Sequence, residues 1–167
     1  MNHRVHIIGV GSPFGDDRFG WVAAETLRRS AVIGDVPAGR IEISILDRPG
    51  AMLPLRWRQT DIVILLDAVR SGATTGTRHY LDARDLSGAG VLYSSHGLGV
   101  VSAVELAAVL GYMPSRLMLR GMEVDASWTG FSLSPSVTAT LPSFVAAVAQ
   151  EALELASFCP PAAANRA

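Results

Sequence analysis

The stretch Val5-His6-Ile7-Ile8-Gly9-Val10-Gly11 decides the fold. Its apolar residues form a short run, which is typical of a strand buried on both faces of a parallel sheet. A second run, Ile62-Val63-Ile64-Leu65-Leu66, is the most apolar in the chain and predicts another buried strand. Between and beyond these two segments, helix and strand patterns alternate, which predicts a doubly wound α/β domain.

The remaining elements follow from local patterns. We expect strands at 41–46, 77–81 and 116–121, the middle one a polar edge strand, and helices at 21–29, 52–57, 102–111 and from 134 onward. Asp16 or Asp17 is expected to cap the first helix, Ser102 to open a capping box, and Pro142 to break or kink the last helix. The predicted fold class is α/β, a three-layer α/β/α arrangement in which a twisted, mostly parallel five-stranded sheet has helices on both faces.

The length of 167 residues fits one domain with one substantial core. We expect a single domain over residues 1–158 and a disordered tail over residues 159–167, which offer little to pack. The lone cysteine, Cys159, cannot form an internal disulfide, which suits a reducing cytoplasm.

The charge pattern excludes several classes of function. Fourteen basic and fifteen acidic side chains give a formal net charge of -1, and the basic residues do not form a run. We therefore expect no nucleic-acid or acidic-membrane partner. The longest apolar stretches fall short of the ~20 residues that a membrane span needs, and the N-terminus runs straight into a strand pattern. A soluble, monomeric, cytoplasmic protein is predicted.

Three acid-base residues follow three separate apolar segments: Asp17, Asp67 and His96. In an open α/β sheet, ligands bind outside the carboxyl ends of the strands, so residues just past three strands can meet at one point. Two carboxylates and an imidazole meeting there would make a metal site. Asp67 is the strongest candidate, because an acid directly after five apolar strand residues is costly to desolvate unless it has a partner.

Each candidate also has a purely structural explanation. Asp17 could be a helix cap, Asp67 could accept the backbone N–H groups of residues 68–72, and His96 could be a solvated loop residue. The other histidines, among them His79, have no acidic partner at a revealing offset in the sequence. The sequence leaves these explanations open.

The glycine-rich turn over residues 9–15 invites a dinucleotide-binding interpretation, with Asp47 as the acid that would bind a ribose. The spacing does not fit, because the third glycine comes one residue late and Pro13 removes a backbone donor. Asp16 and Asp17 would also place negative charge where a pyrophosphate needs positive potential. Serine-hydrolase, phosphate-loop and zinc-protease motifs are absent from the sequence.

The chain resembles the hydrogenase maturation proteases over nearly its whole length. Residues 9–20, Gly-Val-Gly-Ser-Pro-Phe-Gly-Asp-Asp-Arg-Phe-Gly, are similar to the family's opening segment, and Leu65-Leu66-Asp67-Ala68 to its second acidic strand end. Ser95-His96 is similar to its histidine loop. Gly121-Met122-Glu123 and Leu133-Ser134-Pro135-Ser136-Val137 are similar to its late motif.

The resemblance implies a function. Members of the family trim the C-terminal extension from the large subunit of nickel-iron hydrogenases, and the residues that match Asp17, Asp67 and His96 contact metal. It therefore implies an aspartic-type or metal-recognising endopeptidase whose catalytic and metal-contacting residues are these three. Its partner would be the large-subunit precursor, and nickel in that precursor would be the recognition element, with no permanent cofactor. Ser12 departs from the family, which usually has Asn at this position.

Two further points stay open in the sequence. The alternative function is a non-catalytic α/β module that binds a nucleotide or a protein; it explains the glycine turn but not the second acid and the histidine. Aromatic residues at Phe14, Trp128 and Phe131 could contact a partner or fill the core.

Overall fold

A single twisted sheet organises the computed structural model, which describes residues 3–83 and 99–157. Its strands lie in the order β2-β1-β3-β5-β4. Their bounds are β1 Val5–Gly11, β2 Ile41–Asp47, β3 Ile62–Val69, β4 Arg78–Asp82 and β5 Arg116–Glu123. The first three and β5 run parallel, and β4 pairs antiparallel with β5 at the edge. The five-stranded, mostly parallel sheet is therefore confirmed. The expected polar edge strand is β4, and it runs antiparallel to its neighbour.

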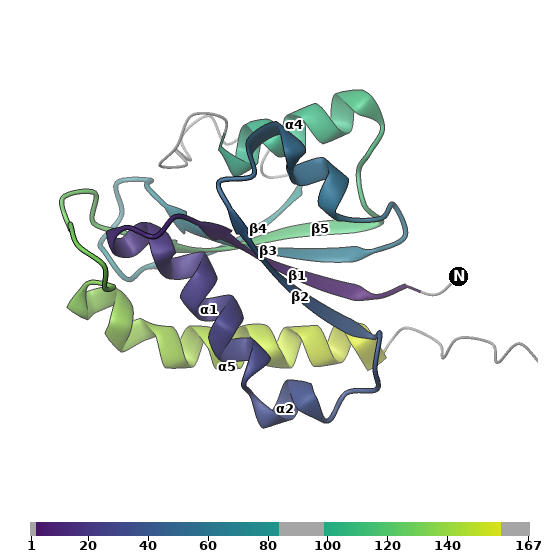
Figure 1. The fold of residues 1–167 in the computed structure, drawn as a ribbon, viewed down its shortest axis with the longest axis horizontal. Helices are drawn as coiled ribbons and strands as arrows, with labels where there is room; N and C mark the ends of the chain where they lie inside the picture. Colours follow the sequence, from purple (N-terminus) through teal and green to yellow (C-terminus); the bar gives the residue numbers. More distant parts are fainter. Residues whose placement is uncertain (1–2, 84–98, 158–167) are drawn as a thin grey trace, which may run out of the picture.

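Helices cover both faces of the sheet (Figure 1). Helices α1 (Phe19–Arg28) and α5 (Pro135–Ser157) pack on one face, with the short α2 (Ala31–Gly34) beside them. The 3-10 helix η2 (Gly50–Arg56) and helix α4 (Val100–Leu110) pack on the other. Alternate residues of each central strand enter the two cores, so Ile7 and Ile64 face α1 and α5 while Ile8 and Leu65 face α4. The three-layer arrangement is thus confirmed.

The glycines of the first turn serve close packing. A Cβ on Gly9 would overlap the backbone of Gly20, and a Cβ on Gly11 would overlap the carbonyl of Asp17. A Cβ on Gly20 would overlap the carbonyl oxygens of Val10 and Leu66. Because none of the three carries a side chain, the start of α1 lies directly on the ends of β1 and β3. This contact, rather than a phosphate, accounts for the glycine pattern.

Three local expectations are wrong. Neither Asp16 nor Asp17 caps α1, because a 3-10 turn, η1 (Gly15–Arg18), precedes it and Arg18 occupies the N-cap position without a side-chain bond. Helix α4 begins at Val100, before the proposed cap Ser102, since Val100 is buried and extends the apolar face. Helix α5 continues through Pro142, so the expected break is wrong, while a kink stays a prediction; Pro142 is exposed, so the carbonyl that the missing N–H leaves free can meet water.

His6 is a buried polar residue in the middle of the apolar strand β1. Its Nε2 lies 2.8 Å from Ser44 Oγ, and its Nδ1 lies 4.0 Å from a carboxylate oxygen of Asp61. Arg4 forms an ion pair with Asp61 at 2.8 Å. Burial lowers the pKa of His6 from 6.5 to about 4, and the charge of Arg4 adds to the effect.

We predict that this histidine makes the fold sensitive to acid. A base whose pKa falls on folding contributes its full stability above the unfolded pKa and loses it as pH falls toward the folded value. The window for His6 is therefore pH 6.5 to about 4. Each pH unit is worth ~1.4 kcal/mol, so the loss should reach about 3 kcal/mol. Urea unfolding should show this loss in the wild type and not in His6→Gln; parallel pH curves for the two proteins would contradict it.

Candidate functional site

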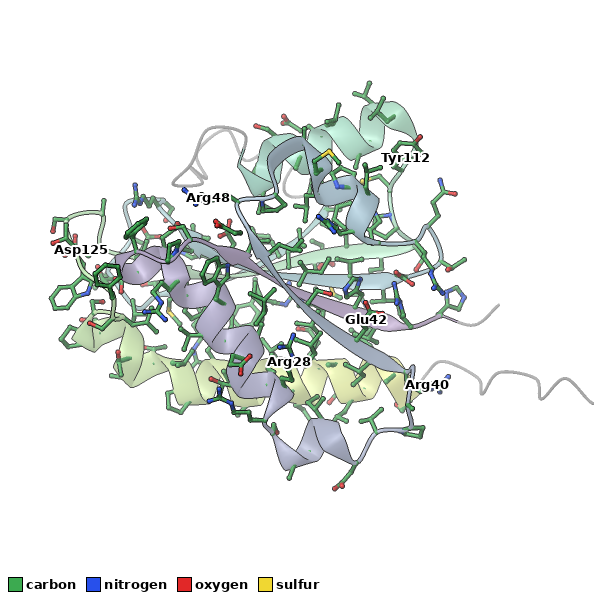
Figure 2. All side chains as sticks on the ribbon, viewed as in Figure 1. Arg28, Arg40, Glu42, Arg48, Tyr112 and Asp125 are labelled. Carbon is green, nitrogen blue, oxygen red and sulfur yellow. The ribbon has the colours of Figure 1, made fainter. Side chains whose placement is uncertain are left out.

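The carboxyl ends of the parallel strands meet at one edge of the sheet, and acidic side chains gather there. Strand β1 leads into η1 with Asp16 and Asp17, β3 carries Asp67, and β5 ends at Glu123. Figure 2 shows Asp125, two residues beyond β5, at this edge, while Glu42 and Arg40 lie at the opposite end of the sheet. The convergence expected for Asp17 and Asp67 follows from this topology.

Asp67 is a buried carboxylate with few hydrogen-bond partners among the described residues. It is 5% exposed, and its Oδ1 accepts the backbone N–H of Ala68 at 2.9 Å. If Asp67 had a purely structural role, it would accept the backbone N–H groups of residues 68–72. The N–H groups of Ser71 and Gly72 donate to Glu123 instead. Burial raises the pKa of Asp67 well above its usual range, and the charge of Asp17 raises it further. The described residues around Asp67 thus stabilise its anion poorly.

Asp17 is held over the end of β1. Its carbonyl oxygen accepts the N–H of Ser12 at 3.2 Å, and its own N–H donates to Phe14. The side chain is buried, and its charge acts on both Asp67 and Arg48. The Ser12 hydroxyl, at the position where the family usually has Asn, is buried without a hydrogen-bond partner among the described residues.

The third candidate, His96, lies outside the described residues. Within residues 3–83 and 99–157, no group of three or more His, Cys, Asp or Glu side chains could hold a metal ion. The described part of the site is therefore a pair of carboxylates, Asp17 and Asp67. Two such oxygen ligands cover only part of a coordination sphere, and a cation between them would offset both their repulsion and the desolvation of Asp67.

Asp16 has a different task from its neighbour. Its carboxylate accepts the N–H and the hydroxyl of Ser134 at 2.6 and 2.7 Å, and the N–H of Asp125 at 3.3 Å. Ser134 directly precedes α5, so this buried residue ties η1 to the start of the last helix. The two adjacent acids therefore have different roles: the carboxylate of Asp16 is hydrogen-bonded within the protein, and Asp17 acts on Asp67.

Glu123 is a buried carboxylate whose network the sequence did not predict. It accepts the N–H and the hydroxyl of Ser71 and the N–H of Gly72, and it bonds His79 Nε2 at 2.8 Å. Hydrogen bonds from Ser71, His79 and Gly72 outweigh burial and lower the pKa of Glu123. The acidic partner of His79 is therefore 44 residues away, where no sequence offset could reveal it. This network fixes the loop that follows β3.

Exposed aromatic side chains flank the carboxylates. Phe14 and Phe131 are 55% and 71% exposed, and their ring centroids lie 5.9 Å apart. Trp128 is less exposed, and its indole N–H donates to Ser132 at 2.9 Å. A core role is therefore wrong for Phe14 and Phe131, which form an apolar surface beside the site; we call these two residues the aromatic pair.

Comparison with known proteins gives a family match. A family model described as hydrogenase maturation protease matches residues 50–151. The hydrogenase expression/formation protein HupD of Thiocapsa roseopersicina is 30% identical over 141 residues. That alignment covers 80% of this chain and 61% of HupD, so the chain spans less than two thirds of that relative's length.

Two solved structures share the fold. An endopeptidase from Escherichia coli has a TM-score of 0.73 and 24% identity, covering 93% of this chain and 94% of its own. The hydrogenase maturating endopeptidase HybD from E. coli has a TM-score of 0.69 and 20% identity, covering 91% of this chain and 93% of its own. At these identities the likeness establishes the fold alone.

Proposed function

The chain belongs to the hydrogenase maturation protease family, and from that membership we propose that it is an endopeptidase acting on a nickel-iron hydrogenase large-subunit precursor. It removes the precursor's C-terminal extension after nickel insertion, and the nickel in the precursor is the recognition element. The observation that carries the proposal is the pair of buried carboxylates, Asp17 and Asp67, at the carboxyl end of the sheet. His96 is proposed as the third residue of this site.

The chemistry of the pair supports a shared cation. Asp17 and Asp67 are both buried, and Asp17 raises the pKa of Asp67, so the charged pair is costly on its own. A divalent ion carried by the substrate would remove that cost only in the complex, which makes recognition depend on the loaded precursor. No permanent metal of the enzyme is needed in this scheme.

Two roles in peptide hydrolysis are open to these carboxylates. They can hold the substrate's nickel, which would polarise the scissile carbonyl, or Asp67 can accept a proton from the attacking water. The raised pKa of Asp67 brings it closer to the neutral range in which a general base works best. In either case water adds across the peptide bond, and the second role, in which a carboxylate activates the water, is the basis for proposing an aspartic-type hydrolase.

The setting of the activity completes the proposal. No helix in the described residues is long and apolar enough to cross a membrane. We propose that the protein works in the cytoplasm, as a monomer, without a nucleic-acid partner. The test is to incubate the purified protein with its nickel-loaded precursor and measure the precursor's intact mass; loss of a C-terminal peptide supports the proposal, and an unchanged mass contradicts it.

The alternative is a non-catalytic module that binds a nucleotide or a protein, and its nucleotide-binding form has lost its main support. The glycines that suggested it are explained by packing of Gly20 on β1 and β3. Titration with dinucleotides separates the two functions, because the protease proposal predicts no saturable binding. Saturable binding at Gly9 to Gly15 would favour the module instead.

We predict that Phe131→Ser weakens binding of the precursor about tenfold while the melting temperature changes little. Phe131 is 71% exposed and packs on Phe14 rather than in the core, so its loss removes contact area without opening a cavity. A binding titration with a cleavage-deficient enzyme measures the effect. Val109→Ser is the matched control, since Val109 is 84% exposed in the last turn of α4. Equal losses in both variants would show that the aromatic pair has no special role.

A further inference from the structure

Asp16 joins two segments that are far apart in the sequence. Three donors converge on its carboxylate, two from Ser134 and one from Asp125, across 118 and 109 residues. Both Asp16 and Ser134 are buried, so these hydrogen bonds are shielded from water. We call this arrangement the Asp16–Ser134 clamp.

Other contacts reinforce the same junction. The N–H of Gly15 donates to the carbonyl of Gly130 at 2.7 Å, and the guanidinium of Arg18 donates to the carbonyl of Phe131. A Cβ on Gly15 would overlap the carbonyl of Trp128. The whole of η1 is therefore held against the loop that leads into α5.

Apart from this junction and the bond from the Ser12 N–H to the Asp17 carbonyl, the turn depends on its own weak hydrogen bonds. It is a 3-10 helix of four residues without a side-chain cap, and such short 3-10 segments have weak hydrogen-bond geometry of their own. It nevertheless carries Asp17, whose charge acts on Asp67. The position of the Asp17 carboxylate must therefore be set largely by contacts outside the turn.

We propose that Asp16 is a positioning residue for this site: through Ser134 it fixes the turn that carries Asp17 and so sets where Asp17 lies relative to Asp67. The proposal rests on the proposed endopeptidase function for its kinetic consequence. Asp16 does not touch the substrate in this scheme. Because a small misplacement of a reacting group lowers the rate steeply, loosening the clamp should lower kcat more than it raises KM.

Ser134→Ala and Ser71→Ala form a matched pair of variants. The Ser134 hydroxyl donates to the buried carboxylate of Asp16 at 2.7 Å, and the Ser71 hydroxyl donates to the buried carboxylate of Glu123 at 2.8 Å. Each substitution removes one hydroxyl and leaves the carboxylate its backbone donors. The two variants should therefore lose similar thermal stability, while only one of them touches the turn that carries Asp17.

The kinetic test compares cleavage of the nickel-loaded precursor by the two variants. We expect Ser134→Ala to lower kcat about tenfold or more with little change in KM, and Ser71→Ala to stay within about twofold of the wild type. Equal kcat values in the two variants, at similar melting temperatures, would overturn the proposal and leave the clamp a purely structural contact.

Amide hydrogen exchange gives a second readout that does not need activity. Ser134→Ala should speed exchange at residues 15–19, which span η1, whereas Ser71→Ala should not. If the wild type fails to cleave the precursor, the proposed function fails, and the exchange pattern still decides whether the clamp holds the turn. Unchanged exchange at residues 15–19 in Ser134→Ala would overturn the clamp itself.

Discussion

Asp67→Asn will raise the melting temperature of the free protein near neutral pH and, in the same molecule, lower precursor cleavage by at least about 100-fold. The two effects have one cause. Asp67 is buried beside Asp17, and both burial and the charge of Asp17 raise its pKa well above 3.8. Asn keeps the acceptor for the N–H of Ala68 but carries no charge. The folded protein therefore no longer has a buried charge that destabilises it, and the site no longer has this metal ligand or base.

The pH dependence of the stability difference follows from linkage. A carboxyl whose pKa rises on folding keeps its full contribution below the unfolded value of 3.8 and loses it as pH rises toward the folded value. The wild type therefore loses stability over this window, and Asp67→Asn does not. The stabilisation by the substitution should be smallest below the unfolded value of 3.8 and should grow as the pH rises toward the folded value.

Thermal unfolding at several pH values measures the first effect, and intact-mass assays of the precursor measure the second. Asp47→Asn is the control, because Asp47 ends β2 at the same edge but is half exposed and pairs with Arg48 at the surface. Such a pair is worth ~0–1 kcal/mol, so this variant should change stability and cleavage little. A destabilised Asp67→Asn that still cleaves would remove Asp67 from the site.

Gly20→Ala will destabilise the fold by about 3 kcal/mol or more. Its Cβ would overlap the carbonyl oxygens of Val10 and Leu66, which are backbone atoms in the two central strands and cannot move aside independently. Helix α1 would have to lift from the sheet, which also disturbs the turn that carries Asp17. For a protein of this size each kcal/mol lowers the melting temperature by ~2–4 °C, so calorimetry should show a fall of about 6–12 °C.

Gly34→Ala provides the matched control for this substitution. Gly34 also lies in a helix, α2, but nothing is within 4 Å of a Cβ built at this position. Alanine there should be neutral or stabilise by up to ~1 kcal/mol, since it restricts the unfolded chain. If both variants melt alike, close packing of α1 on the sheet does not explain the glycine pattern.

The sheet was predictable because its strands are encoded locally. The apolar runs after Val5 and Ile62 specify buried strands by their own composition, and their ends mark the edge where Asp17 and Asp67 lie. Topology then follows from the rules of parallel α/β sheets. The expectation that these two residues lie at one edge of the sheet needed no more than this, and the catalytic and metal-contacting roles of Asp17, Asp67 and His96 stay predictions.

Hydrogen-bonded pairs that only the fold brings together could not be predicted from the sequence. Asp16 and Ser134 are 118 residues apart, and Glu123 and His79 are 44 residues apart, so neither pair shows in local spacing. Local cap signals failed for the same reason. The capping motif at Ser102 was overridden by burial of Val100, a tertiary effect.

The most direct test of the account is the nickel dependence of cleavage. Large-subunit precursor is prepared from the same source with and without nickel, each form is incubated with the wild-type protein, and intact mass is recorded over time. The account predicts loss of a C-terminal peptide from the loaded form alone, because the carboxylates of Asp17 and Asp67 engage the metal that the substrate carries. Equal cleavage of both forms, or an unchanged mass for the loaded form, would contradict it.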